Sequence, residues 1–217
     1  MTDTSSSTRN HVALRGLGPA SWGPSAAGAP PLVDLEAAER AARDLLVALG
    51  QPVESEAMTR TPHRMVQAYL EMLTAEPFDF TTFANTEGYD ELVVVQDIPV
   101  RSLCEHHMLP FVGVAHLGYL PGDRILGLSK LARVVDLHSH RAQTQERLTQ
   151  QVAEHLDHHL APRGVGVVVE AEHSCMSLRG VRATGARTVT SALLGTLRSD
   201  PASRAEFLSL VRSGEHR

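Results

Sequence analysis

The sequence predicts an α+β fold in which an antiparallel sheet carries helices on one face. Segments with apolar residues at helical spacing alternate with pairs of apolar, β-branched segments, and short links join the members of each pair. Hydrophobic residues make up 42% of the 217 residues, which is enough to bury a core. The expected order is helices, two strands, helices, two strands and a final helix. Four strands leave two open edges, and closure of the sheet by oligomerisation would cover them.

The N-terminal region divides into a tail and a helical part. Residues 1–31 are rich in Ser, Gly, Ala and Pro without a period, which predicts a flexible tail. From Asp34, apolar residues recur at helical spacing until Gly50. Thr61-Pro62 then has the form of an N-cap followed by proline at the first helical position. Residues 32–90 are therefore expected to form a helical region.

Residues 91–217 carry the strand patterns and are expected to form the main domain. The expected strands are LVVVQDIPV running into SLCEHHMLP, then FVGVAHLGYL, VGVVVEAEHSCMSLRG and RTVTSALLGTL. The expected helices span residues 129–139, 144–160 and 201–212, with Asp200 as the N-cap of the last.

The charge balance limits the partners of the chain. The net charge is −5, which argues against a broad surface for nucleic acid or an acidic membrane. The longest apolar runs fall short of the ~18 residues of a membrane span, and the first residues lack the pattern of a signal peptide. We therefore expect a cytoplasmic protein with no nucleic-acid or membrane partner.

Both cysteines of the chain lie in clusters that contain histidine. Cys104 and His107 are three residues apart, a spacing at which a tight turn brings two ligands to one metal ion. His173 and Cys175 are two apart, and in an extended segment they would face one pocket together. Two thiolates and one imidazole suit zinc and leave a fourth position for water, the pattern of a catalytic site. His106 and His173 would then serve in proton transfer. The structural alternative is that the cysteines only fill space in the core.

A second cluster is suited to phosphate. Ser129, Lys130 and Arg133 open a predicted helix whose N-terminal amides and dipole favour an anion. Lys130 is the only lysine in the chain, and Arg179 could approach from the strand side. A solvated basic surface explains the same residues equally well.

A third feature is the segment Gln143-Thr144-Gln145-Glu146-Arg147. The Glu146 carboxylate could accept hydrogen bonds from the ring N–H and the exocyclic amine of guanine, a donor pair that adenine lacks. From the sequence alone, an ordinary helix start with an acidic first turn is the simpler interpretation.

At these residues the chain resembles GTP cyclohydrolase I over about residues 60–213. The matching blocks are SLCEHHMLPFVG, HLGYLP, ILGLSKLARVV, QTQERLTQQ, GVGVVVEAEHSCMSLRG, RTVTS and RAEFLSLVR. The order of the two cysteine blocks with GLSK and QERLT between them makes the match highly specific. The segment HSHRAQTQE departs from many relatives at His138, His140 and Thr144, but Glu146 is intact.

The resemblance implies a role for each candidate residue. Zinc would be held by Cys104, His107 and Cys175, and the catalytic histidines would be His106 and His173. Glu146 would anchor the guanine base with Gln145 nearby. The ribose triphosphate would be held by Ser129, Lys130, Arg133 and Arg179.

The resemblance also implies an assembly and a reaction. Residues 91–217 would form a catalytic tunnelling-fold domain, whose sheets join into a barrel in a homodecamer of two pentamers with active sites between subunits. Water activated by zinc would attack C8 of GTP, and the products would be formate and 7,8-dihydroneopterin triphosphate. The alternatives are another tunnelling-fold pterin or purine enzyme, such as a pyruvoyl-tetrahydropterin synthase or a nitrile-reducing queuosine enzyme, and an inactive zinc-binding paralogue. The Cys, His and Cys pattern argues against the first, and the intact His106 and His173 argue against the second.

Overall fold

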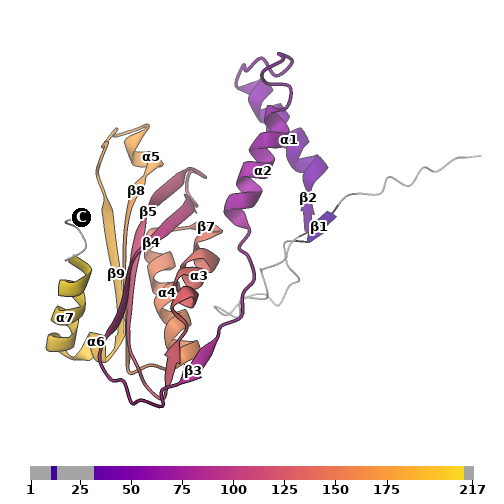
Figure 1. Cartoon of the computed structure of the whole chain (residues 1–217). Helices are drawn as coiled ribbons and strands as arrows, with labels where there is room; N and C mark the ends of the chain where they lie inside the picture. The colour runs from indigo at the N-terminus through magenta and orange to yellow at the C-terminus, as the bar shows by residue number, and fades with distance from the viewer. Residues whose placement is uncertain (1–10, 14–31, 213–217) are drawn as a thin grey trace, which may run out of the picture. The chain divides into compact units, whose positions relative to one another are not determined.

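The computed structural model describes residues 11–13 and 32–212 (Figure 1). They belong to two compact units, which divide after Thr74. The predicted flexible tail over residues 1–31 lies outside the described residues, apart from His11–Ala13.

The first unit is a helical pair with a small strand pair before it. Strand β1 (His11–Ala13) pairs antiparallel with β2 (Leu32–Asp34), and helices α1 (Leu35–Ala48) and α2 (Thr61–Leu73) follow. Asp34 caps α1 as predicted, because its carboxylate accepts a hydrogen bond from the Ala37 amide at 3.0 Å. Helix α2 begins one residue earlier than expected: Arg60 holds the N-cap position and Thr61 is already helical.

The second unit is an α+β domain around a five-stranded sheet. Its strands are β3 (Thr82–Ala84), β4 (Val93–Cys104), β5 (Pro110–Leu120), β6 (Arg124–Leu126), β7 (Ala142–Gln143), β8 (Gly164–His173) and β9 (Thr188–Gly195). Its helices are α3 (Leu128–Ser139), α4 (Gln145–Leu160), α5 (Ser174–Ser177), α6 (Thr196–Ser199) and α7 (Pro201–Arg212). The sheet order is β7-β4-β5-β8-β9, while β3 and β6 form a separate pair. The predicted α+β class is confirmed.

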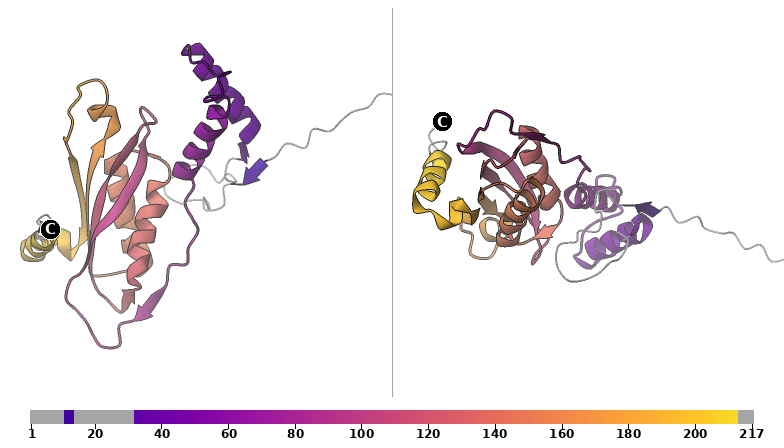
Figure 2. Two further views of the ribbon diagram at one scale, coloured as in Figure 1. Left: turned by 45° about the horizontal axis from the view of Figure 1, so that its top comes forward. Right: turned by 90° about the horizontal axis from the view of Figure 1, so that it is seen from below.

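Helices α3 and α4 cover one face of this sheet, as the sequence predicted (Figures 1 and 2). Alternate residues of β8, among them Val165, Val167 and Val169, enter the core that these helices share with the sheet. Val168 points to the other face and joins a smaller cluster with Leu197 of α6 and with residues of α7. Sequence reasoning placed no helix on that second face.

Two glycines let α7 approach the second face. Gly118 of β5 and Gly166 of β8 are paired across the sheet. A Cβ atom on Gly166 would lie 2.6 Å from the Phe207 ring, and one on Gly118 would lie 2.9 Å from it. The fully buried Phe207 therefore occupies space that these two residues leave open.

Two differences from the predicted strands bear on the pocket described below. The short strand β7 adds a fifth member and pairs parallel with the end of β4, whereas the other neighbours in the sheet are antiparallel. The second difference concerns Cys175, which lies in α5 and not in a strand. The pairing of β8 with β5 ends at His173 opposite Phe111, and the next residue of β5 is Pro110, which has no N–H to donate. The extended conformation predicted for Cys175 was therefore wrong.

Within residues 11–13 and 32–212, none of the helices combines the length and the apolar character that crossing a bilayer requires.

Candidate metal centre

A pocket of about 230 Å³ opens where β4, β8, α4 and α5 meet. It is lined by Cys104, His106, His107, Gln143, Thr144, Gln145, Glu146, His173, Cys175, Met176 and Thr188. The two cysteine clusters and the QTQE segment, which the sequence singled out separately, thus form one site.

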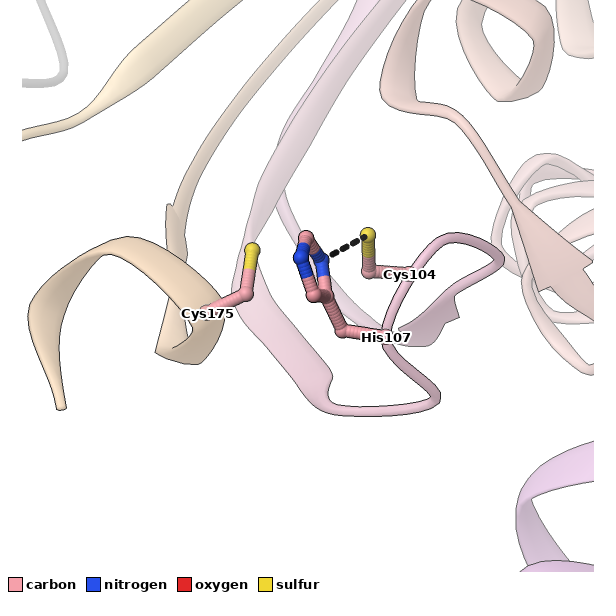
Figure 3. Close-up of side chains that lie close together, drawn as sticks. All are labelled: Cys104, His107 and Cys175. Atoms are coloured by element: carbon pink, nitrogen blue, oxygen red, sulfur yellow. Dashed lines mark hydrogen bonds between the residues drawn. The ribbon is translucent and has the colours of Figure 1, made fainter. Parts of the chain in front are cut away.

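Three side chains in this pocket form a group that could hold a metal ion. Cys104 is the last residue of β4, His107 lies in the turn that follows, and Cys175 lies in α5. Their side chains point toward one another from the two sides of the pocket (Figure 3). One ligand atom from each lies within 4.8 Å of the other two. Cys175 therefore reaches the pocket beside His173, as expected, but from α5 and not from a strand.

The donor set and its spacing fit zinc. A tetrahedral zinc ion with bonds of about 2.3 Å to sulfur and 2.0–2.1 Å to nitrogen separates the two donors by about 3.6 Å. The Sγ atom of Cys104 lies 3.8 Å from Nδ1 of His107. Both cysteines are free thiols, and sulfur and imidazole donors suit zinc. The distance between the donors therefore suits one zinc ion, and both thiols are available to bind it.

The geometry separates the two neighbouring histidines. Nδ1 of His106 lies as close to Sγ of Cys104 as Nδ1 of His107 does, at 3.8 Å. Of these two histidines, His107 belongs to the group whose ligand atoms all lie within 4.8 Å of one another, and His106 does not. The imidazole of His106 is 67% exposed. It is placed to meet a ligand that enters from solvent.

The electrostatics of the thiols favour a bound cation. Burial raises the pKa of Cys175, the neighbouring Cys104 thiol raises it further, and Arg179 acts in the opposite direction. A bound metal ion would favour the thiolate form of both cysteines, because a thiolate is the form that ligates a metal. The influence of Arg179 on Cys175 places this exposed arginine on the same side of the domain as the pocket.

His173 is held from two sides. Its ring stacks on the buried ring of Phe111, with centroids 4.6 Å apart and 11° between the planes. Its Nε2 atom lies 2.8 Å from Oε1 of Gln145. Burial lowers the pKa of His173, and the carboxylate of Glu146 opposes this shift. Sequence reasoning missed Phe111, because its contact with His173 depends on the register between β5 and β8.

Glu146 and Gln145 are neighbours in sequence with different surroundings. Both lie in the first turn of α4, which Thr144 caps by accepting a hydrogen bond from the Arg147 amide at 3.3 Å. Glu146 is exposed at the pocket, while Gln145 is only 1% exposed. The carboxylate is thus available to a ligand, and the amide of Gln145 is mostly enclosed by protein.

The turn that carries the histidines is anchored by Arg147, a contact that the sequence did not reveal. Its guanidinium pairs with Glu105, and this hydrogen bond lowers the pKa of the Glu105 carboxyl group. The same guanidinium donates to Oε1 of Gln143 at 2.7 Å and to the carbonyl of Ala142 at 3.0 Å. Arg147 therefore ties the turn after Cys104 to β7 and α4.

The predicted phosphate-binding residues of α3 are not in this pocket. Ser129, Lys130 and Arg133 are absent from the residues that line it. They lie in the first half of α3, whereas its other end, at Ser139, accepts a hydrogen bond from the Ser102 hydroxyl at 2.6 Å. A twelve-residue helix is about 18 Å long, so Lys130 is far from the end that lies beside Cys104. One chain thus carries two separate parts of the predicted site.

Fold and pocket together define an α+β protein with a Cys, His, Cys group able to hold a metal ion beside two further histidines. The sequence model of the family described as GTP cyclohydrolase I matches residues 38–212. The chain belongs to this family, and the tunnelling fold expected from the sequence accords with the observed α+β architecture.

Individual relatives agree with the family assignment. A protein of Streptomyces griseus subsp. griseus named GTP cyclohydrolase 1 is 54% identical over 82% of this chain and 90% of its own length. Proteins of the same name from Mycolicibacterium gilvum and Thermoanaerobacter pseudethanolicus are 50% and 47% identical, over 83% and 84% of this chain and 92% and 99% of theirs. A solved structure, that of the archaeosine synthase QueF-Like in the apo form, aligns with 48% of this chain and 93% of its own at 19% identity and a TM-score of 0.41, a likeness too low to add to the assignment.

Proposed function

We propose that this protein is a zinc-dependent GTP cyclohydrolase I, which hydrolyses the guanine ring of GTP at C8 and yields formate and 7,8-dihydroneopterin triphosphate. The observation that carries the proposal is the meeting of Cys104, His107 and Cys175 in one pocket with His106 and His173. Family membership and the names of the relatives support the same activity.

Cys104, His107 and Cys175 would hold the metal, and zinc is the ion that their chemistry favours. When bound, zinc supplies Lewis-acid activation that brings the pKa of water to about 7. Three protein ligands match the pattern of catalytic zinc sites and not that of closed structural sites.

The remaining pocket residues would bind the base and move protons. Glu146, exposed at the pocket, would accept hydrogen bonds from the N–H groups of the guanine pyrimidine ring. His173, which lines the pocket beside the proposed metal ligands, would exchange a proton with the imidazole part of guanine. His106, exposed beside Cys104, is the second candidate for proton transfer.

A neighbouring subunit would complete the site. Ser129, Lys130 and Arg133 lie too far along α3 to reach this chain's own pocket, and Arg179 lies near it. Within the described residues the sheet ends at β9 on one side and at the two-residue β7 on the other, which leaves most of the outer edge of β4 uncovered. Pairing of β9 with β4 of the next copy would join the sheets into a barrel. A homodecamer of two pentamers in the cytoplasm is the assembly and location that we propose.

The direct test is incubation of the zinc-loaded protein with GTP. We expect equimolar formate and, after oxidation, a fluorescent pterin, and removal of zinc with a chelator should abolish both. ATP is the matched control substrate, because adenine lacks the donor pair that Glu146 would bind. If correctly assembled, zinc-loaded protein releases no formate from GTP, the protein is instead an inactive zinc-binding relative.

A further inference from the structure

The amide of Gln145 is enclosed between three elements of the sheet and helix layers. Gln145 is the first residue of α4 and is 1% exposed. Its Nε2 atom donates to the carbonyl of Val169 in β8 at 3.0 Å and to that of Thr188 in β9 at 2.9 Å, with Oγ1 of Thr190 at 3.2 Å. Both amide hydrogens therefore have acceptors within the protein.

These partners fix which way the amide points. Backbone carbonyls can only accept hydrogen bonds, so the nitrogen of Gln145 must face Val169 and Thr188. The opposite orientation would place the amide oxygen against two carbonyl oxygens, which would repel it, and would lose both hydrogen bonds. Oε1 of Gln145 is consequently the atom that faces His173, at 2.8 Å from Nε2.

An amide oxygen carries no hydrogen, so the hydrogen of this bond must come from His173. The neutral ring of His173 therefore has its hydrogen on Nε2 and a lone pair on Nδ1. Stacking on Phe111 opposes a flip of the ring that would exchange the two nitrogens.

We infer that Gln145 is a positioning residue, which orients the ring of His173 and holds it as the Nε2–H tautomer, with the lone pair on Nδ1. The inference rests on the proposed function for the identity of the substrate, but the tautomer itself does not. It assigns Gln145 an action through His173, in addition to its place in the lining of the pocket.

The tautomer is measured in the unaltered protein. Zinc-loaded, full-length protein labelled with ¹⁵N-histidine is sedimented at pH 8, and solid-state NMR distinguishes protonated from unprotonated ring nitrogens. His173→Gln identifies the signals by their loss. We expect a protonated Nε2 and an unprotonated Nδ1, and a neutral ring with the hydrogen on Nδ1 overturns the inference. This result does not depend on turnover, so it stands apart from the test with GTP.

The action through His173 is measured by a double-mutant cycle. Gln145→Met keeps the length of the side chain and removes its hydrogen bonds. We expect kcat to fall about 10- to 100-fold, with KM for GTP changed less than about threefold and zinc content unchanged. In the background of His173→Ala, the same substitution should have no further effect on kcat. An equal loss in both backgrounds overturns the inference, because it shows that Gln145 acts independently of His173.

Gln143→Met is the matched control. Gln143 is also buried and lines the same pocket, but its Nε2 donates to the carbonyl of His138 at 2.9 Å and to Oε1 of Gln151 at 2.8 Å. Its effect on kcat should be the same with and without His173. If Gln145→Met does not fold, the NMR measurement on the unaltered protein still decides the tautomer.

Discussion

The ring of His173 stacks almost parallel on the ring of Phe111, directly opposite it across the pair of strands β5 and β8. Phe111 is fully buried in the main core, so the ring of His173 packs against a residue that neighbouring core side chains hold in place. Proton transfer requires a donor held to within a fraction of an ångström. The stacking is one of two contacts that provide this, the other being the hydrogen bond to Gln145.

Phe111→Leu should therefore lower turnover while leaving the metal ligands in place. We expect kcat to fall about 10-fold or more, because the ring of His173 loses the surface that orients it. Unfolding in urea should show a loss of about 1–3 kcal/mol, since a buried aromatic ring is replaced by a smaller side chain. Steady-state kinetics on samples with full zinc occupancy measures the first effect. Unchanged kcat would show that the stacking does not orient His173.

The spacing of the side chains favours His107 over His106 as a metal ligand. Cys104→Ala, Cys175→Ala and His107→Ala should each weaken zinc binding by at least about 100-fold, because each would remove one of the three proposed ligands. His106→Ala is the matched control and should retain one zinc per chain while losing turnover. Elemental analysis after dialysis measures both. Full zinc in His107→Ala together with loss of zinc in His106→Ala would reverse the assignment.

Two inactive variants should restore activity to each other if a site takes its parts from two subunits. Cys175→Ala removes a proposed metal ligand from the pocket of its own chain. Lys130→Glu removes the proposed phosphate-binding side chain of α3, which would serve the site of a neighbouring subunit. When equal amounts are unfolded together and refolded, roughly a quarter of the sites combine two intact parts. The assay is formate release at a GTP concentration below KM. Either variant refolded alone is the control, and activity no higher than theirs would place both parts in one chain.

A pair of buried histidines should make the domain sensitive to acid. Nε2 of His138 lies 3.1 Å from Nδ1 of His155, and both side chains are buried between α3 and α4. Burial lowers the pKa of His138 to about 3, with Arg141 and His155 contributing, and lowers that of His155 to about 4, with His159 and His158 contributing.

Both folded-state pKa values lie below the ordinary value of about 6.5, so the unfolded chain binds more protons between these limits. Stability is therefore full above pH ~6.5 and decreases as the pH falls toward the folded-state values. The loss at pH 5 should be on the order of 2 kcal/mol for each histidine. Urea unfolding at pH 7.5 and pH 5 measures it. His138→Leu/His155→Leu should lose less stability between these pH values than the unaltered protein, whereas His63→Gln, at an exposed position of α2, should not change the difference.

Gly166 should tolerate no side chain while Phe207 is present. Gly166→Ala would place a methyl group 2.6 Å from the Phe207 ring, and we expect a loss of about 1–3 kcal/mol in the free energy of unfolding. Phe207→Leu costs stability by itself, but in that background Gly166→Ala should cost much less. Equal costs of Gly166→Ala in both backgrounds would show that the strain lies elsewhere than at α7.

Features formed by residues close in sequence were predictable from the sequence alone. Asp34 caps α1 as expected, and Asp200 accepts hydrogen bonds from the amide and the hydroxyl of Ser203 at 2.8 and 2.6 Å at the start of α7. The pairing of Cys104 with His107 is equally local, since one turn contains both. Such features depend on a few adjacent backbone and side-chain groups, and the sequence states them directly.

The tertiary structure alone decided what depends on distant residues. The residues of α3 that were predicted to bind phosphate are separated from the pocket by the length of that helix. Cys175 reaches the pocket from α5, because the pairing of β8 with β5 ends before Pro110. His173 is held by Phe111 of β5 and Gln145 of α4, which lie 62 and 28 positions before it in the sequence. These contacts are set by strand register and helix placement, which the whole core determines by packing and which no short segment encodes.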